Sequence, residues 1–165
     1  MSRPLVGIVM GSDSDLQAMS GASEILTKFG VPFEMTVASA HRSPDRSSQY
    51  ARSAIDRGLK VIIAGAGWAA HLAGVLAAET TLPVIGVPMD SSPLNGLDAL
   101  MSTVQMPPGI PVATMALGRG GAQNAGILAV QILALTDESL QKKLKDHKAE
   151  LVKGVEEKAA RVENQ

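Results

Sequence analysis

The sequence lacks cysteine altogether and has few aromatic residues: one Trp, one Tyr and two Phe among 165 residues. The absence of cysteine excludes disulfide bonds, thiolate nucleophiles and cysteine-ligated metal sites, and it favours a cytoplasmic protein. Hydrophobic residues still make up 45% of the chain. The core must therefore consist mainly of Ala, Val, Ile, Leu and Met side chains, which suit helices packed closely on a sheet.

Strong net charge and long apolar runs are also missing. The formal net charge is −1, so the chain has no excess of positive charge that would predict binding to nucleic acid or to an anionic membrane. The first apolar run, residues 5–10, is too short for a signal peptide or a membrane span, and we expect a protein that is not exported. The length of 165 residues lies in the range expected of one main domain, roughly 100–200 residues.

Five apolar runs separated by helical patterns predict a parallel sheet that is covered on both faces. The expected strands are residues 5–10, 33–38, 60–65, 83–87 and 112–117. Helices are expected over residues 16–29, from Ser43-Pro44 towards Gly58, after Gly67, from Ser92-Pro93 to Val104, and over residues 122–135. This alternation predicts a three-layer α/β/α sandwich over residues 1–136, with a flavodoxin-like, doubly wound sheet of five parallel strands.

The tail, residues 137–165, carries seven acidic and seven basic residues. Its apolar stripe recurs at steps of three and four, which predicts an amphipathic C-terminal helix; the stripe consists of Leu140, Leu144, His147, Leu151 and Val155. Because this helix follows a complete α/β unit, we expect it to dock at a subunit interface or on the flank of the domain. We expect His147 to pack there among the leucines.

A histidine and an arginine follow the second predicted strand, in the sequence Ser-Ala-His-Arg-Ser-Pro at residues 39–44. In an open parallel sheet, ligands bind at the carboxyl ends of the strands. His41 changes charge near neutral pH and Arg42 attracts anions, so the pair predicts proton transfer on an anionic substrate. The alternative is a solvated loop histidine beside a surface arginine.

The loop Gly11-Ser12-Asp13-Ser14-Asp15 follows the first strand and opens the first helix. Glycine permits a tight turn, and the free amides at a helix start attract anions. The two serine hydroxyls, with the Asp15 carboxylate as an acceptor for sugar hydroxyls, predict a site for a ribose phosphate. A simple N-cap role for Ser12 or Asp13 is the alternative.

Residues 65–70, Gly-Ala-Gly-Trp-Ala-Ala, fit a dinucleotide-binding fingerprint with Asp90 as ribose ligand. The motif follows the third strand and no second mononucleotide half comes after it, which argues against NAD. We expect Gly65 to Gly67 to form a floor for a flat heterocycle, with His71 either as a polar contact or bonded to a backbone carbonyl. The proline-rich loop of residues 105–111 is expected to line a site or interface, or to be a plain turn. No carboxylate and histidine pair has metal-ligand spacing, so we expect no metal.

Four segments in this order resemble the N5-carboxyaminoimidazole ribonucleotide mutase family, the bacterial type of PurE. They are Gly-Ser-Asp-Ser-Asp, Ser-Ala-His-Arg-Ser-Pro, Gly-Ala-Gly-x-Ala-Ala-His-Leu and Val-Gln-Met-Pro-Pro-Gly-Ile-Pro-Val, at residues 11–15, 39–44, 65–72 and 104–112. The resemblance covers about residues 5–136. It implies an isomerase of de novo purine biosynthesis that moves a carboxylate from the exocyclic nitrogen of an aminoimidazole ribonucleotide to ring carbon 4, without ATP, metal or organic cofactor. It also implies a homo-octamer with active sites at subunit contacts.

By this resemblance His41 is the catalytic acid and base. Ser12, Asp15 and Arg42 match positions that bind phosphate and ribose, and the expected substrate-binding set is completed by Ser14, Ser39, Gly67 and His71. Trp68 stands where the family has Gly, and Ala73 where it has Pro; Trp68 lies beside the expected floor, where its side chain either narrows the pocket or packs against a neighbour. Two other functions stay open: an aminoimidazole ribonucleotide carboxylase that uses CO2 directly, and a non-catalytic flavodoxin-like nucleotide-binding module that would not need His41.

Overall fold

Five parallel strands form a single sheet in the computed structural model, which describes residues 3–164. The strands are β1 (Val6–Met10), β2 (Phe33–Val37), β3 (Val61–Ala66), β4 (Val84–Pro88) and β5 (Ala113–Thr114). Their order across the sheet is β2-β1-β3-β4-β5, and every pairing is parallel. This is the flavodoxin-like order, so the predicted fold class is confirmed.

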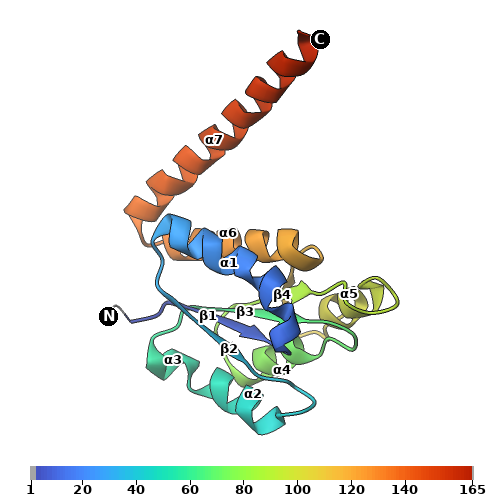
Figure 1. The fold of residues 1–165 in the computed structure, drawn as a ribbon. Helices are drawn as coiled ribbons and strands as arrows, with labels where there is room; N and C mark the ends of the chain where they lie inside the picture. Colours follow the sequence, from blue (N-terminus) through green and yellow to red (C-terminus); the bar gives the residue numbers. More distant parts are fainter. Residues whose placement is uncertain (1–2, 165) are drawn as a thin grey trace. The chain divides into compact units, whose positions relative to one another are not determined.

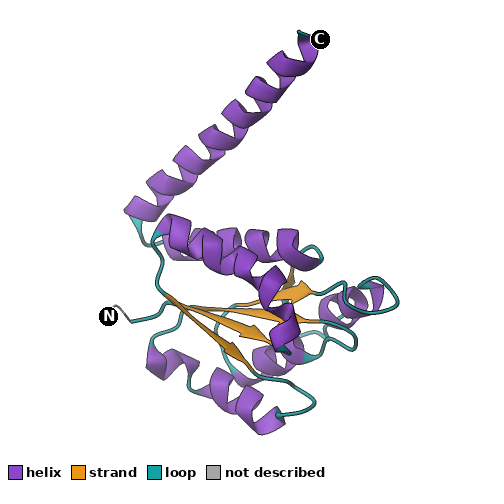
Figure 2. Ribbon diagram, viewed as in Figure 1, coloured by secondary structure: helices purple, strands orange, loops and turns teal. Residues whose placement is uncertain are grey.

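Helices cover both faces of this sheet (Figures 1 and 2). They are α1 (Leu16–Phe29), α2 (Pro44–Arg52), α3 (Ala54–Arg57), α4 (Leu72–Glu79), α5 (Leu97–Val104) and α6 (Gly118–Ala134). Figure 1 shows α1 and α6 on one face, with α2, α3 and α4 on the other. A short 3-10 helix, η1 (Asp13–Asp15), precedes α1. The layers match the predicted sandwich.

Local chemistry explains several helix boundaries. Gly30 ends α1 in the left-handed conformation with φ 72°, and its N–H is directed at the carbonyls of Leu26 and Thr27. Pro44 starts α2, where its missing N–H costs nothing. The expected second helix is divided at Ser53, whose hydroxyl donates to the Gln49 carbonyl at 2.8 Å. Such bonding back to the helix backbone weakens the continuing helix.

Three elements are shorter than the sequence predicts. The helix after Gly67 begins only at Leu72. The helix expected from Ser92-Pro93 begins at Leu97, after turns in which Asn95 and Gly96 have φ of 50° and 84°. The last strand is reduced to two residues at the sheet edge, where it pairs with β4 alone. The loops after β3 and β4 are therefore longer than expected, and they lie at the carboxyl edge.

Glycines let the helices approach closely, as the shortage of large side chains predicts. A Cβ on Gly21 would lie 2.9 Å from the Arg119 carbonyl oxygen, and one on Gly126 would lie 3.0 Å from that of Ala22. Both contacts join α1 to α6. Arg119 reinforces them with a two-pronged ion pair to Glu24, at 2.6 and 2.8 Å. The helix that carries the Ser12 loop is thus held firmly.

The chain divides into two compact units, Met1–Val130 and Gln131–Gln165. The second unit contains α7 (Glu138–Glu163), whose first turn is capped by Asp137: its carboxylate accepts from the N–H groups of Ser139 and Leu140 at 2.9 and 3.2 Å. Of the predicted stripe, Leu140 is buried and the His147 side chain is 11% exposed. The C-terminal half of the stripe is exposed. The predicted boundary at residue 136 and the docking of this helix stay predictions.

No helix within residues 3–164 combines the length and the apolarity that a membrane crossing needs.

Candidate active site

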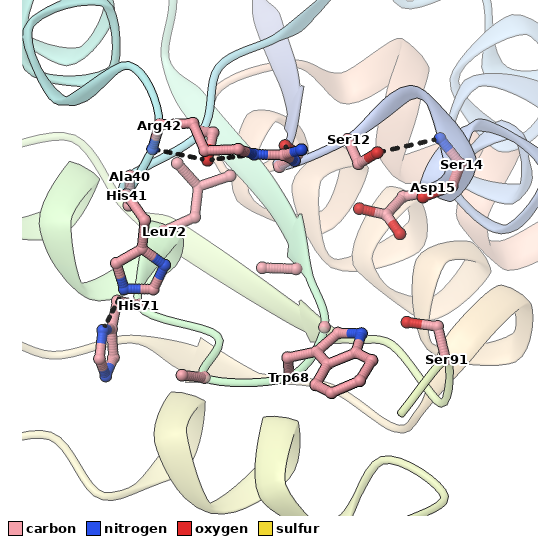
Figure 3. A pocket seen from close by; sticks show the side chains of 15 residues that line it. Ser12, Ser14, Asp15, Ala40, His41, Arg42, Trp68, His71, Leu72 and Ser91 are labelled. Carbon is pink, nitrogen blue, oxygen red and sulfur yellow. Dashed lines mark hydrogen bonds between the residues drawn. The ribbon is translucent and has the colours of Figure 1, made fainter. Parts of the chain in front are cut away.

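A pocket of about 440 Å³ opens at the carboxyl edge of the sheet (Figure 3). The chain leaves β1 towards α1 on one face and leaves β3 towards α4 on the other, so the two loops diverge and open a crevice between them. The lining comes from the loops after β1, β2, β3 and β4: Gly11, Ser12, Ser14, Asp15, Ser39, Ala40, His41, Arg42, Ala66, Gly67, Trp68, Ala69, His71, Leu72 and Ser91.

Ser12 shapes the first loop of the pocket. Its backbone is extended and caps η1, and its Oγ accepts from the Ser14 N–H at 3.3 Å. The same hydroxyl donates to the Asp13 carboxylate at 3.2 Å. Ser12 is therefore an N-cap, as the simpler alternative holds, and it also lines the pocket. The two roles are compatible, because the Ser12 side chain that caps η1 lies at the edge of the cavity.

Asp15 is a carboxylate with little access to water, since only 7% of the residue is exposed. Burial raises its pKa, while a backbone hydrogen bond from Ser12 and the positive charge of Arg42 act in the opposite direction. Figure 3 shows the carboxylate directed into the pocket. A buried acceptor in this position gains from hydrogen-bond donors on a ligand, such as paired sugar hydroxyls.

Two serines fold the second loop into a rigid turn. The Ser43 hydroxyl accepts from the Ser39 N–H at 2.9 Å and donates to the Ser39 carbonyl at 3.1 Å. The turn sends Arg42 across to the first loop, where Nη2 donates to the Gly11 carbonyl at 3.0 Å. Nη1 has no hydrogen-bond partner among residues 3–164. The guanidinium is thus fixed beside Ser12 with a donor available to an anion.

The two histidines of the pocket contact each other. His41 Nε2 and His71 Nδ1 lie 2.8 Å apart, and the rings meet at 71° with centroids separated by 4.8 Å. One hydrogen occupies this contact, so one facing nitrogen must donate while the other accepts. The His71 ring is therefore bonded to a side chain of the pocket, whereas the sequence left open a bond to a backbone carbonyl. Two imidazoles in direct contact can pass a proton from one ring to the other.

The floor of the pocket differs from the expectation. Ala66 and Gly67 line it, but Gly65 does not. A Cβ on Gly65 would overlap the Met19 sulfur and lie 2.9 Å from Met19 Cγ. Met19 belongs to α1, so Gly65 faces that helix and makes room for the Met19 side chain. Gly67, in contrast, is at the pocket, where its Cβ would lie 2.6 Å from Ser91 Oγ.

All eight residues predicted for the site lie around this one pocket: Ser12, Ser14, Asp15, Ser39, His41, Arg42, Gly67 and His71. Sequence reasoning missed Ser91, although its place just after β4 is the signal that pointed to the other three loops. It also missed the apolar lining by Ala40 and Leu72. Neither Asp90 nor the loop of residues 105–111 lines the pocket; Met106 of that loop packs over Gly74 in α4.

In the part of the chain that the structure describes, no three His, Asp or Glu side chains are grouped so that they could hold a metal ion. The fold and the pocket define the class of protein: a flavodoxin-like α/β protein in which an arginine, several serines, a buried carboxylate and a histidine pair surround one pocket.

Comparison with known proteins assigns the family. Residues 5–153 match the model of the AIR carboxylase family, and the chain belongs to that family. It is 55% identical over 161 residues to the N5-carboxyaminoimidazole ribonucleotide mutase of Pyrococcus horikoshii, covering 98% of this chain and 90% of that protein. It is 56% identical to the phosphoribosylaminoimidazole carboxylase of Schizosaccharomyces pombe, of which it covers 29%. The crystal structure of PurE from Treponema denticola is 28% identical, with a TM-score of 0.83 over 94% of this chain and 96% of that one.

Proposed function

We propose that this chain is an isomerase of purine biosynthesis that converts N5-carboxyaminoimidazole ribonucleotide to 4-carboxy-5-aminoimidazole ribonucleotide. The observation that carries the proposal is the distribution of groups in one pocket, with Arg42 and Ser12 at one end and the His41–His71 pair at the other. This suits a substrate that has a phosphate at one end and a reactive heterocycle at the other. Relatives that are 55 and 56% identical over nearly the whole chain carry the name of this mutase.

The anionic end of the substrate is held by the first two loops. Arg42 supplies a positive charge and a directed donor, and Ser12 and Ser14 supply hydroxyls, with Ser39 supporting the arginine at its Nε and backbone N–H. Asp15 accepts hydrogen bonds from the ribose hydroxyls. These contacts place the imidazole ring between Gly67 and the two histidines, so that the reacting nitrogen and carbon 4 are near His41.

The reaction requires two proton transfers, one to the exocyclic nitrogen and one from ring carbon 4. His41 donates a proton to the exocyclic nitrogen as the C–N bond breaks, which releases CO2 and leaves the free amine. Carbon 4 then attacks the CO2 and forms the new C–C bond, and His41 takes back the proton lost from carbon 4. The atoms balance without ATP, metal or organic cofactor. His71 positions His41 and fixes its tautomer through the 2.8 Å contact.

Replacement of His41 tests this role. His41→Asn should lower kcat for the isomerisation by roughly 10²- to 10⁴-fold, while calorimetry still shows binding of aminoimidazole ribonucleotide. The matched control is His147→Asn in the second unit, which should keep full turnover. Turnover by His41→Asn equal to that of the unchanged protein would refute the assignment and would favour a binding module.

A substrate comparison separates the mutase from a carboxylase. We expect conversion of N5-carboxyaminoimidazole ribonucleotide without added bicarbonate or ATP, and little product from aminoimidazole ribonucleotide and dissolved CO2. The opposite preference would identify a CO2-dependent carboxylase on the same pocket.

We further propose that the enzyme acts in the cytoplasm as a homo-oligomer, an octamer by its family resemblance. The absence of cysteine suits a reducing compartment. One face of α5 leaves Leu97, Met101 and Val104 between 45 and 58% exposed, and such an apolar helix face suits a subunit contact. Light scattering of the full chain tests this, and a monomeric mass would refute it.

A further inference from the structure

Trp68 has a backbone conformation that does not suit its side chain. Its φ is 55°, and among the described residues the other positive φ outside glycine belongs to Asn95. The left-handed region is disfavoured for residues with a bulky side chain, whereas glycine adopts it freely and asparagine tolerates it. Strain of this kind is concentrated at functional sites. The backbone at position 68 therefore favours glycine, yet the residue found there is tryptophan, which has the largest side chain of all.

The indole gains little from packing in the core. Trp68 is 59% exposed, and its residue is part of the pocket lining. Figure 3 shows the ring along one wall, with Ser91 beside it and Asp15 across the cavity, while the histidine pair lies at the other end. A large, half-exposed aromatic surface on a strained backbone, directed at a cavity, has the properties of a ligand contact.

We propose that the Trp68 indole is a positioning and affinity determinant that packs against the nucleoside part of the substrate, an inference that rests on the proposed function. The phosphate-binding donors, Ser12 and Arg42, are on the first two loops, whereas Trp68 follows Gly67 on the third. An apolar ring gains nothing from contact with a phosphate and gains from covering a sugar or a flat heterocycle.

Binding measurements on three variants test the proposal. Trp68→Ala and Trp68→Gly should each weaken binding of aminoimidazole ribonucleotide by roughly 3- to 10-fold, whereas Trp68→Phe should retain most of the affinity. Inorganic phosphate should bind all four proteins equally, since its contacts lie elsewhere. The two truncating variants separate strain from contact: Trp68→Gly should melt at a higher temperature than Trp68→Ala, because glycine accepts φ 55° without strain.

Fluorescence provides a direct readout, because the chain has a single tryptophan. Titration with aminoimidazole ribonucleotide should change the emission along a saturable curve, and Arg42→Lys should move that curve to higher concentration without changing its end point.

The outcomes distinguish this inference from the proposed function. Binding by the unchanged protein together with equal binding by Trp68→Ala overturns the role of Trp68 and leaves the enzyme assignment intact. Two other results with Trp68→Ala would also overturn the proposed role of Trp68. One is a loss of affinity by the same factor for phosphate and ribonucleotide, and the other is a changed oligomeric mass. In either case the indole would act through the fold or a subunit contact. Failure of the unchanged protein to bind the ribonucleotide refutes the proposed function itself.

Discussion

Replacing Gly65 by Ala tests which glycine of the Gly65-Ala66-Gly67 segment serves packing and which serves the pocket. The new Cβ would overlap the Met19 sulfur and lie 2.9 and 3.0 Å from Met19 Cγ and Cε. Met19 is fully buried, so its side chain cannot turn out into solvent. Overpacking of this kind costs about 1–3 kcal/mol. For a chain of this length, a loss of that size lowers the melting temperature by roughly 2–12 °C.

A double-mutant cycle isolates the contact. Met19→Ala alone should cost about 2–5 kcal/mol through the cavity that it leaves. In that background the methyl group of Gly65→Ala has room, so its added cost should fall close to zero. The free energies of unfolding, measured by urea denaturation, should therefore be less than additive by about 1–3 kcal/mol.

Gly67→Ala is the matched control for this cycle. Its Cβ would meet the hydroxyl of Ser91, an exposed side chain that can rotate away, and would lie 3.3 Å from the Cβ of the buried Met89, a tight contact that needs only a small shift. Stability should fall less than it does in Gly65→Ala, because no atom of a fully buried side chain overlaps the new methyl group, while affinity for aminoimidazole ribonucleotide falls because the methyl group occupies the pocket. If Gly65→Ala instead left stability unchanged and abolished binding, Gly65 would belong to the floor and the packing argument would be wrong.

Three further predictions concern the anion end of the pocket, the buried carboxylate and the tail. Arg42→Lys should weaken ribonucleotide binding about 10- to 100-fold in calorimetry, because a directed guanidinium contact is lost; unchanged affinity would place the phosphate elsewhere. The raised pKa of Asp15 means that its ionised form destabilises the fold as pH rises through that pKa. Asp15→Asn should therefore melt higher than the unchanged protein at pH 7, converge with it below about pH 3.9, and bind the ribonucleotide less tightly. Equal melting at pH 7 would contradict the burial argument. Ending the chain after residue 136 should leave a folded α/β unit in smaller assemblies by light scattering, and an unchanged subunit number would show that the tail plays no part in assembly.

The predicted site residues line one pocket because topology relates the strand ends to one another. Once five apolar runs are read as parallel strands, the segments after them must lie at one edge of the sheet. His41, Arg42 and Ser12 could thus be assigned to one pocket from their places in the chain. Ser91 follows the same rule but belongs to no recognisable motif, so it was overlooked.

The fold class, the strand order and the loops that surround the pocket were determined by the sequence itself, because apolar periodicity and helix end signals act over a few residues. Contacts between distant segments were decided only by the tertiary structure. The Gly-Ala-Gly segment does not reveal that Gly65 faces α1 while Gly67 faces the cavity, since that depends on the end of β3 at Ala66, beyond which the regular alternation stops, and on the position of Met19. Likewise, the hydrogen bond between His41 and His71 joins side chains 30 residues apart. It exists because the loops after β2 and β3 come together across β1, a proximity that only the folded sheet creates.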